Sequence, residues 1–146
     1  MKTVASYNIS LKIFLKNDKW EVLILKTPDS SSFHWKYDFP GWRIDKNEFH
    51  TWYLGILKRE ITEEIWNVEV EIINKVVAIA RHYAPKIDKQ DEYIFYNFWE
   101  WNILWKNIKI SNEHTWIKWV KLEDIKLEDY FESWMLEAVK MYLNKY

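Results

Sequence analysis

Three carboxylates lie close together on a segment that has the pattern of a helix. Glu60, Glu63 and Glu64 are spaced i, i+3 and i+4, which places them together on about one helical turn. Their mutual repulsion costs only about 0.2–0.5 kcal/mol per pair, so an ordinary solvated acidic face is compatible with the same spacing. Clustered oxygen ligands without Cys or His suit Mg²⁺ or Mn²⁺ better than Zn²⁺. The cluster therefore predicts either a site for divalent cations or a solvated acidic face.

The apolar residues of this segment indicate the element that positions the carboxylates. They recur at three- and four-residue steps and make one stripe, which is typical of an amphipathic helix packed on a core. The stripe consists of Leu54, Leu57, Ile61, Ile65 and Val68. Upstream, Pro40-Gly41 indicates a tight turn, and Glu48 adds a fourth carboxylate before the helix. We expect the acidic face of the helix to lie across from the bend at Gly41.

These features resemble the signature of the Nudix hydrolases, which reads Gly, five residues, Glu, seven residues, Arg-Glu-apolar-x-Glu-Glu-x-Gly-apolar. The matching positions are Glu48, Arg59, Glu60, Ile61, Glu63 and Glu64, and Pro40-Gly41 matches the turn that usually precedes them. Ten residues, 49 to 58, separate Glu48 from Arg59, which we interpret as a three-residue lengthening of the loop before the helix. Trp42 and Trp66 stand at the two signature glycines, and Asn67 stands at the closing apolar position.

The resemblance implies a hydrolase that cuts a pyrophosphate bond in a nucleoside diphosphate linked to some moiety X, with a nucleoside triphosphate as one candidate. It implies Mg²⁺, or Mn²⁺, as cofactor, and the implied metal ligands are Glu60, Glu63, Glu64 and the backbone carbonyl of Gly41. Arg59 and Glu48 match residues that orient the catalytic groups. The alternative is a Nudix-fold module that binds or senses a nucleotide with little or no turnover. The complete carboxylate set favours the enzyme, whereas Trp42 argues against activity.

The general base varies between members of the family, so the resemblance leaves three candidates: Glu64, Glu60 and a carboxylate outside the helix. Glu113 is our choice for the outside carboxylate and for a further metal ligand. It lies in a polar loop six residues before Trp119, a placement similar to the extra Glu ligand of some relatives. A solvated loop carboxylate beside His114 is the plain alternative.

The numbers of Gly and Trp are unusual for a chain of this length. There are 2 Gly and 11 Trp, whereas average usage of about 7% Gly would give roughly ten glycines. Trp42 lies in the tight turn, where an indole would crowd a phosphate ligand, and Trp66 ends the helix, where a residue without a Cβ is favoured. Either the source organism reads as Gly some UGA codons that were translated here as Trp, or the packing is genuinely rich in Trp. Turn-like or helix-boundary contexts also hold Trp101, Trp105, Trp116 and Trp134.

Length and composition narrow the class of protein. The 146 residues, 1–146, suit a single domain, and a net charge of −1 favours neither nucleic acid nor an anionic membrane. The absence of Cys excludes disulfides and thiolate metal sites, and no apolar run reaches the roughly 18 residues of a transmembrane helix. We expect a cytoplasmic protein that acts on a small-molecule nucleotide, with neither membrane nor duplex nucleic acid as partner. The identity of X and the oligomeric state stay open.

Strand and helix patterns alternate along the chain. Alternation from Ile9 to Leu15 predicts a strand with one buried face, and the apolar run from Val22 to Leu25 suits the middle of a sheet. Residues 68–84 are predicted to form one strand, or two with a bend near 74–75, and further strands are predicted at 93–99 and 115–120. A second amphipathic helix is predicted over 133–143, with Ser133 as its N-cap. This order predicts an α/β protein with a mixed sheet between helices, the same α/β/α sandwich that the Nudix resemblance implies.

Overall fold

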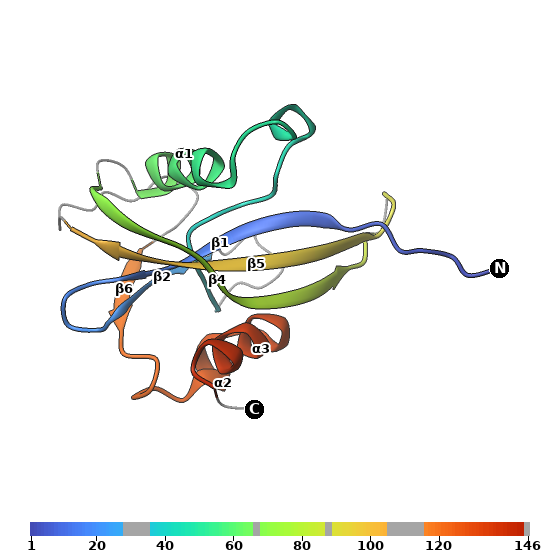
Figure 1. Cartoon of the computed structure of the whole chain (residues 1–146). Helices are drawn as coiled ribbons and strands as arrows, with labels where there is room; N and C mark the ends of the chain where they lie inside the picture. Colours follow the sequence, from blue (N-terminus) through green and yellow to red (C-terminus); the bar gives the residue numbers. More distant parts are fainter. Residues whose placement is uncertain (28–35, 66–67, 87–88, 105–115, 145–146) are drawn as a thin grey trace.

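A mixed β-sheet forms the middle layer of the molecule, with helices on both of its faces (Figure 1). The computed structural model describes residues 1–27, 36–65, 68–86, 89–104 and 116–144. α1 (Tyr53–Ile65) covers one face of the sheet, and α2 (Leu127–Tyr130) and α3 (Ser133–Tyr142) cover the other. This three-layer arrangement confirms the predicted sandwich. Within these described ranges, no helix is long and apolar enough to cross a membrane.

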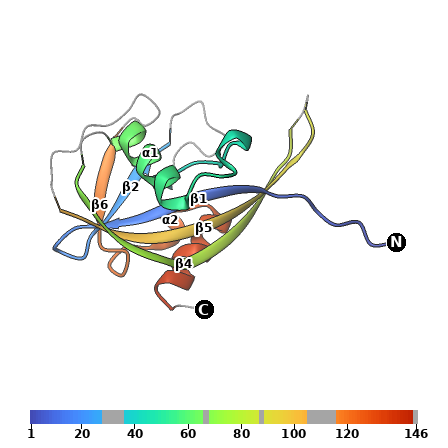
Figure 2. The same ribbon diagram turned by 45° about the horizontal axis from the view of Figure 1, so that its top comes forward.

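The described strands pair in the order β3-β2-β1-β5-β4, and β6 pairs with β2 away from that path. β1 and β5 run parallel, whereas every other pairing of named strands is antiparallel. Figure 2 shows β6 lying beside β2. The strands are β1 (Asn8–Lys16), β2 (Val22–Lys26), β3 (Tyr37–Asp38), β4 (Val70–Ala84), β5 (Glu92–Ile103) and β6 (Ile117–Val120).

β1 lies at the centre of the sheet and is buried on both faces. Leu11 and Ile13 pack in the apolar cluster beneath α1, while Phe14 packs in the cluster beneath α3 and stacks on Tyr142. Lys12 points to the α3 side and is only 2% exposed. The predicted period of two is confirmed, but the prediction of a single buried face is wrong, because α3 covers the second face.

The helices depart from the predictions at their ends. α1 buries Ile56, Leu57, Ile61 and Ile65, whereas Leu54 is only partly buried and Val68 lies beyond the end of the helix. Burial of each large apolar side chain stabilises the fold by about 1.5–3 kcal/mol, so this stripe fixes α1 to the sheet. α3 begins at Ser133 itself with Glu132 as its N-cap, so the prediction that Ser133 caps the helix is wrong.

β4 is one strand rather than two. Its pairing register with β5 shifts between Ile72 and Val76 and again between Val76 and Ala78. Such register shifts are typical of a β-bulge, which bends a strand without ending it, and they lie where the bend near residues 74–75 was predicted.

The hairpin between β1 and β2 places a tryptophan where a glycine is usually needed. The N–H of Trp20 donates to the Asn17 carbonyl at 3.2 Å, and the N–H of Asn17 donates to the Glu21 carbonyl at 3.0 Å. Trp20 adopts a φ of +63°, a left-handed conformation that costs a residue with a Cβ about 1–2 kcal/mol. Hairpin loops that end in this conformation normally carry Gly there. Trp20 is 76% exposed, so packing offsets little of that cost.

The other tryptophans named as glycine-like differ among themselves. Trp101 lies inside β5 and is fully buried, which contradicts the turn-like context that we expected. Trp134 is the second residue of α3, a helix boundary as predicted, and stacks on Tyr96 with ring centroids 4.6 Å apart. Trp116 directly precedes β6. Trp66 and Trp105 lie outside the described residues.

Candidate active site

The turn at Gly41 is pressed against the backbone of β1. The N–H of Leu11 donates to the Trp42 carbonyl at 3.0 Å, and the N–H of Ile13 donates to the Pro40 carbonyl at 2.9 Å. Gly41, between these bonds, adopts a φ of +123°, and a Cβ at this position would lie 2.0 Å from the Leu11 carbonyl oxygen. Only glycine can therefore bring the chain this close to β1.

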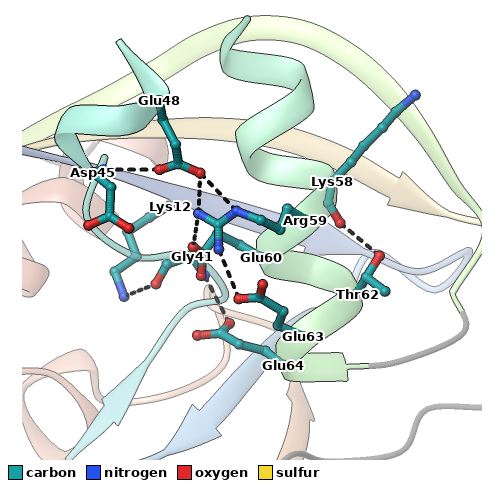
Figure 3. A network of polar contacts seen from close by, with 10 residues as sticks. All are labelled: Lys12, Gly41, Asp45, Glu48, Lys58, Arg59, Glu60, Thr62, Glu63 and Glu64. Carbon is teal, nitrogen blue, oxygen red and sulfur yellow. Dashed lines mark hydrogen bonds and ion pairs between the residues drawn. The ribbon is translucent and has the colours of Figure 1, made fainter. Parts of the chain in front are cut away.

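The acidic face of α1 lies across from this turn, as the sequence predicted (Figure 3). The N–H of Gly41 donates to Glu64 Oε2 at 2.9 Å, which ties the helix to the turn. Glu60 and Glu64 are 4% and 3% exposed, whereas the side chain of Glu63 is 57% exposed. Glu60 and Glu64 are thus buried, whereas Glu63 is exposed to solvent.

Arg59 joins the carboxylates to one another. Its Nε lies 2.8 Å from Glu48 Oε1, its Nη2 lies 2.7 Å from Glu60 Oε1, and its Nη1 lies 2.9 Å from Glu63 Oε2. Partial burial works against the charge of the guanidinium, but the hydrogen bonds to Glu63 and Glu48 outweigh it, and the pKa of Arg59 is raised. The planar guanidinium therefore holds three carboxylates in fixed positions.

Glu48 is placed by a short helical turn before α1. It ends the 3₁₀ helix η1 (Lys46–Glu48), and its Oε2 accepts the N–H of Asp45 at 3.0 Å. Its other oxygen accepts from Arg59. Glu48 therefore links the chain after Gly41 to α1, which is the geometry of an orienting residue.

Burial changes the acidity of Glu60. Removal from water is the largest cause, and the negative charges of Glu64 and Glu63 add to it, while the guanidinium of Arg59 works in the opposite direction. Together they raise the pKa of Glu60 from its ordinary value of 4.5 to about 7. The site therefore holds more negative charge than its surroundings stabilise, and a cation placed there would favour the ionised form.

The donors around Gly41 have the chemistry of a site for divalent cations. They are carboxylate and backbone carbonyl oxygens, the ligands that Mg²⁺ prefers, and the excess negative charge at Glu60 fits a bound cation. Among the described residues, however, no three Asp, Glu or His side chains are already gathered into a ligand shell. Arg59 and the Gly41 N–H hold the carboxylate oxygens instead. Arg59 contacts one oxygen of Glu60 and one oxygen of Glu63, so a metal ion can reach the second oxygen of each carboxylate or draw the side chains away from Arg59.

Lys12 and Asp38 belong to the same site, although the sequence analysis did not identify them. Lys12 Nζ lies 2.8 Å from Asp38 Oδ2 and 2.7 Å from the Gly41 carbonyl oxygen. Both residues are buried, with side chains 3% and 10% exposed. The available signal was a lysine between Leu11 and Ile13 in a strongly apolar strand, since a lysine seldom lies in a central strand without a buried partner.

A cavity of about 300 Å³ lies beside the Gly41 turn. Trp42 borders it, 54% exposed, with its ring 5.6 Å from Lys12 Nζ and 5.7 Å from the guanidinium carbon of Arg43. Tyr96 and Trp134 add aromatic surface to the lining. Glu60, Glu63 and Glu64 do not line this cavity, and the crowding of a ligand by Trp42 stays a prediction.

Glu113, predicted as a further metal ligand and candidate base, lies outside the described residues, as does His114. Among the described residues, the candidate site therefore comprises Gly41, Glu48, Arg59, Glu60, Glu63 and Glu64, together with Lys12 and Asp38.

Comparison with solved structures identifies the architecture. The MutT protein from Methanosarcina mazei Go1 superimposes with a TM-score of 0.77 at 18% identity, over 99% of this chain and 98% of that one. A Nudix hydrolase from Nitrosomonas europaea gives 0.70 at 17% identity, over 98% and 73%. The chain has the Nudix fold. An ADP-ribose pyrophosphatase from Streptococcus suis 89-1591 shares it, with a TM-score of 0.63 at 15% identity over 95% and 91%.

Comparison of sequences adds nothing to this result, since no family model and no curated protein matches the chain. At identities below 20%, the likeness to Nudix structures shows the fold, and a fold does not by itself fix an activity. The activity has to be argued from the residues around Gly41. In this Nudix fold the segment between Glu48 and Arg59 contains the start of α1 at Tyr53, so residues 49–52 form the connection whose length we interpreted as increased.

Proposed function

We propose that the protein is a Mg²⁺-dependent Nudix pyrophosphohydrolase, with Mn²⁺ as an alternative cofactor. The observation that carries the proposal is the hydrogen bond from the Gly41 N–H to Glu64, because it brings the carboxylate face of α1 against the turn that the Nudix signature places beside it. The Nudix fold and the ring of carboxylates around Arg59 support the same conclusion. A solvated acidic face would have no need for two buried glutamates.

In this proposal, Glu60, Glu63 and Glu64 are the groups available to hold the ion. The Gly41 carbonyl, which the resemblance implies as a further ligand, accepts a hydrogen bond from Lys12 Nζ at 2.7 Å. A divalent cation supplies polarisation of the phosphoryl oxygens and a lower pKa for the attacking water. Arg59 and Glu48 position the carboxylates, as their contacts indicate. The general base is Glu60, Glu64 or a carboxylate outside α1, with Glu113 as our candidate.

The substrate that we propose is a small nucleotide in which a nucleoside diphosphate is linked to a further group X, including nucleoside triphosphates. The cavity beside Gly41 supports this choice, because its volume of about 300 Å³ suits a small ligand. Two proteins of similar fold are named as an ADP-ribose pyrophosphatase and a UDP-X diphosphatase. ADP-ribose and UDP-X each consist of a nucleoside diphosphate linked to a further group. We further propose a cytoplasmic location, which the lack of Cys favours.

A second candidate function is a nucleotide-binding or sensing module with weak or no turnover. One observation favours it: Trp42 replaces the first glycine of the signature and borders the cavity with an indole that is half exposed. If Trp42 crowds the ligand, Trp42→Gly alone should raise nucleotide affinity in an equilibrium titration. Identical affinity before and after the change would count against crowding.

The test of the proposed function is a hydrolysis screen with Mg²⁺. The panel contains nucleoside triphosphates, ADP-ribose, dinucleoside polyphosphates and capped RNA, and released phosphate products are measured. In a protein carrying Trp42→Gly and Trp66→Gly, adding Glu64→Gln should abolish turnover while the fold survives. Glu123→Gln is the matched control, since it removes the same charge from an exposed turn. Turnover unchanged by Glu64→Gln would remove Glu64 from the site.

A further inference from the structure

Lys12 contacts the carbonyl oxygen that the Nudix resemblance implies as a metal ligand. Its ammonium nitrogen is 2.7 Å from the Gly41 carbonyl oxygen, 2.8 Å from Asp38 Oδ2 and 3.3 Å from the Phe39 carbonyl oxygen. An ammonium group has three donors, so these three acceptors satisfy it without water. Figure 3 shows Lys12 reaching the turn beside Gly41.

The surroundings of Lys12 keep it in this position. The residue is 2% exposed, Asp38 balances its charge, and the ring of Trp42 lies 5.6 Å away, within the range of a cation–π contact. To leave, the ammonium would have to give up all three acceptors and leave the Asp38 carboxylate buried without a counter-charge, which is strongly unfavourable.

The Gly41 carbonyl cannot easily serve two cations. If a divalent ion approached this oxygen while Lys12 stayed, two positive charges would lie a few ångströms apart in a site largely withdrawn from water, where like charges repel strongly. The other end of the same residue is occupied as well, because its N–H donates to Glu64. Both polar groups of Gly41 are therefore already bonded within the protein.

We propose that Lys12 is a built-in cation of the active site, which occupies the Gly41 carbonyl in place of a divalent ion. The inference rests on the proposed function and deepens it: divalent ions are confined to Glu60, Glu63 and Glu64. Lys12 is a positioning residue here, since it acts through the Gly41 turn. The site consequently binds divalent ions more weakly than the same site with Lys12 removed.

The test compares three proteins in their metal binding. The unaltered protein is compared with the double variant Lys12→Met and Asp38→Asn, which removes the ammonium without leaving a buried charge unpaired. Lys16→Met is the matched control, because Lys16 is on the same strand and pairs with Glu100 at 3.3 Å rather than with Gly41. If the double variant does not fold, Lys12→Gln combined with Asp38→Asn replaces it, since the two amides can hydrogen-bond to each other without a buried charge.

The chain offers a direct readout, because Gly41 and Gly55 are its two glycines. Glycine labelled with ¹³C at the carbonyl gives one signal for each, and Gly55 in α1 is the internal reference. Saturating Mg²⁺ should leave the Gly41 signal nearly unmoved in the unaltered protein and in Lys16→Met. In the double variant it should move several-fold further, and the affinity for Mg²⁺ should rise by about tenfold.

Three other results are distinguishable. An equally large Gly41 shift in the unaltered protein would show that Lys12 yields to the ion, and would overturn the inference. Bound Mg²⁺ with no Gly41 shift in any of the proteins would also overturn it, because the carbonyl would then not be a metal position even without Lys12. If the unaltered protein and both variants bind no Mg²⁺ at all, the proposed function itself fails, and the inference fails with it.

Discussion

Replacing Gly41 by alanine tests whether the turn beside α1 is as close to β1 as the structure indicates. The added Cβ would lie 2.0 Å from the Leu11 carbonyl oxygen, and the neighbour is backbone rather than a flexible side chain. A positive φ costs a residue with a Cβ about 1–2 kcal/mol. Relieving the clash would break the bonds to the Trp42 and Pro40 carbonyls, each worth about 0.5–1.5 kcal/mol. We therefore expect Gly41→Ala to lower the free energy of unfolding by about 2–5 kcal/mol.

Gly55→Ala is the matched control for that substitution. Gly55 lies in α1 with ordinary helical backbone, and its added methyl would lie 3.3 Å from Thr51 Cγ2, a side-chain atom that can give way. Alanine is better than glycine in a helix by about 0.5–1 kcal/mol, so this variant should be neutral or slightly more stable. Urea denaturation measures both changes. Equal effects of the two substitutions would refute the close approach of Gly41 to β1.

Three further predictions concern single side chains. The pKa of Glu60 is raised to about 7 in the folded state, so its contribution to stability is complete below about pH 4.5 and is lost as pH rises through 7. In urea denaturation without Mg²⁺, the free energy of unfolding should therefore fall by about 1–3 kcal/mol over this pH range, and Glu60→Gln should remove that fall. A flat pH profile in the unaltered protein would contradict the burial of Glu60. Arg59→Lys should destabilise the fold by about 1–2 kcal/mol and raise the pKa of Glu60 further, since an ammonium cannot reproduce the contacts of the guanidinium. The pKa of Glu60 is measured by ¹³C NMR. An unchanged pKa would show that the contact between Arg59 and Glu60 is unimportant. Trp20→Gly should stabilise the protein by about 1 kcal/mol in the same urea assay, because glycine adopts the positive φ of this position without cost. If Trp42 and Trp66 are encoded glycines, their codons should be UGA. UGG codons at both positions would end that hypothesis.

The layers of the fold could be predicted from the sequence because each depends on local patterns. The apolar stripe of α1 and the alternation in β1 are properties of a few neighbouring residues, and both appear in the structure. Burial on the second face of β1 could not be predicted, because it depends on α3, which lies more than a hundred residues further along the chain. The prediction of the α3 N-cap was wrong by one residue. Ser133 has a side chain that suits an N-cap, but the helix begins at that residue.

The residues of the candidate site that belong to the sequence motif could be predicted, whereas those brought together by tertiary packing could not. The spacing of Glu60 and Glu64, with Pro40-Gly41 upstream, was enough to predict the carboxylate face opposite the turn, and the Gly41–Glu64 hydrogen bond agrees with it. The pairing of Lys12 with Asp38 joins residues 26 positions apart, and neither belongs to the motif. The lysine within an apolar strand was the one local signal, and nothing local indicated Asp38 as its partner.

The measurement that most directly tests the central claim is Mn²⁺ binding followed by electron paramagnetic resonance, with a non-hydrolysable nucleoside diphosphate present. We predict that the unaltered protein binds Mn²⁺ and that Glu60→Gln combined with Glu64→Gln weakens binding by at least about tenfold. The control, Glu123→Gln combined with Glu137→Gln, removes equal charge from exposed positions and should bind as the unaltered protein does. Equal Mn²⁺ affinity in the Glu60 and Glu64 variant would contradict the assignment of the α1 carboxylates as the metal site.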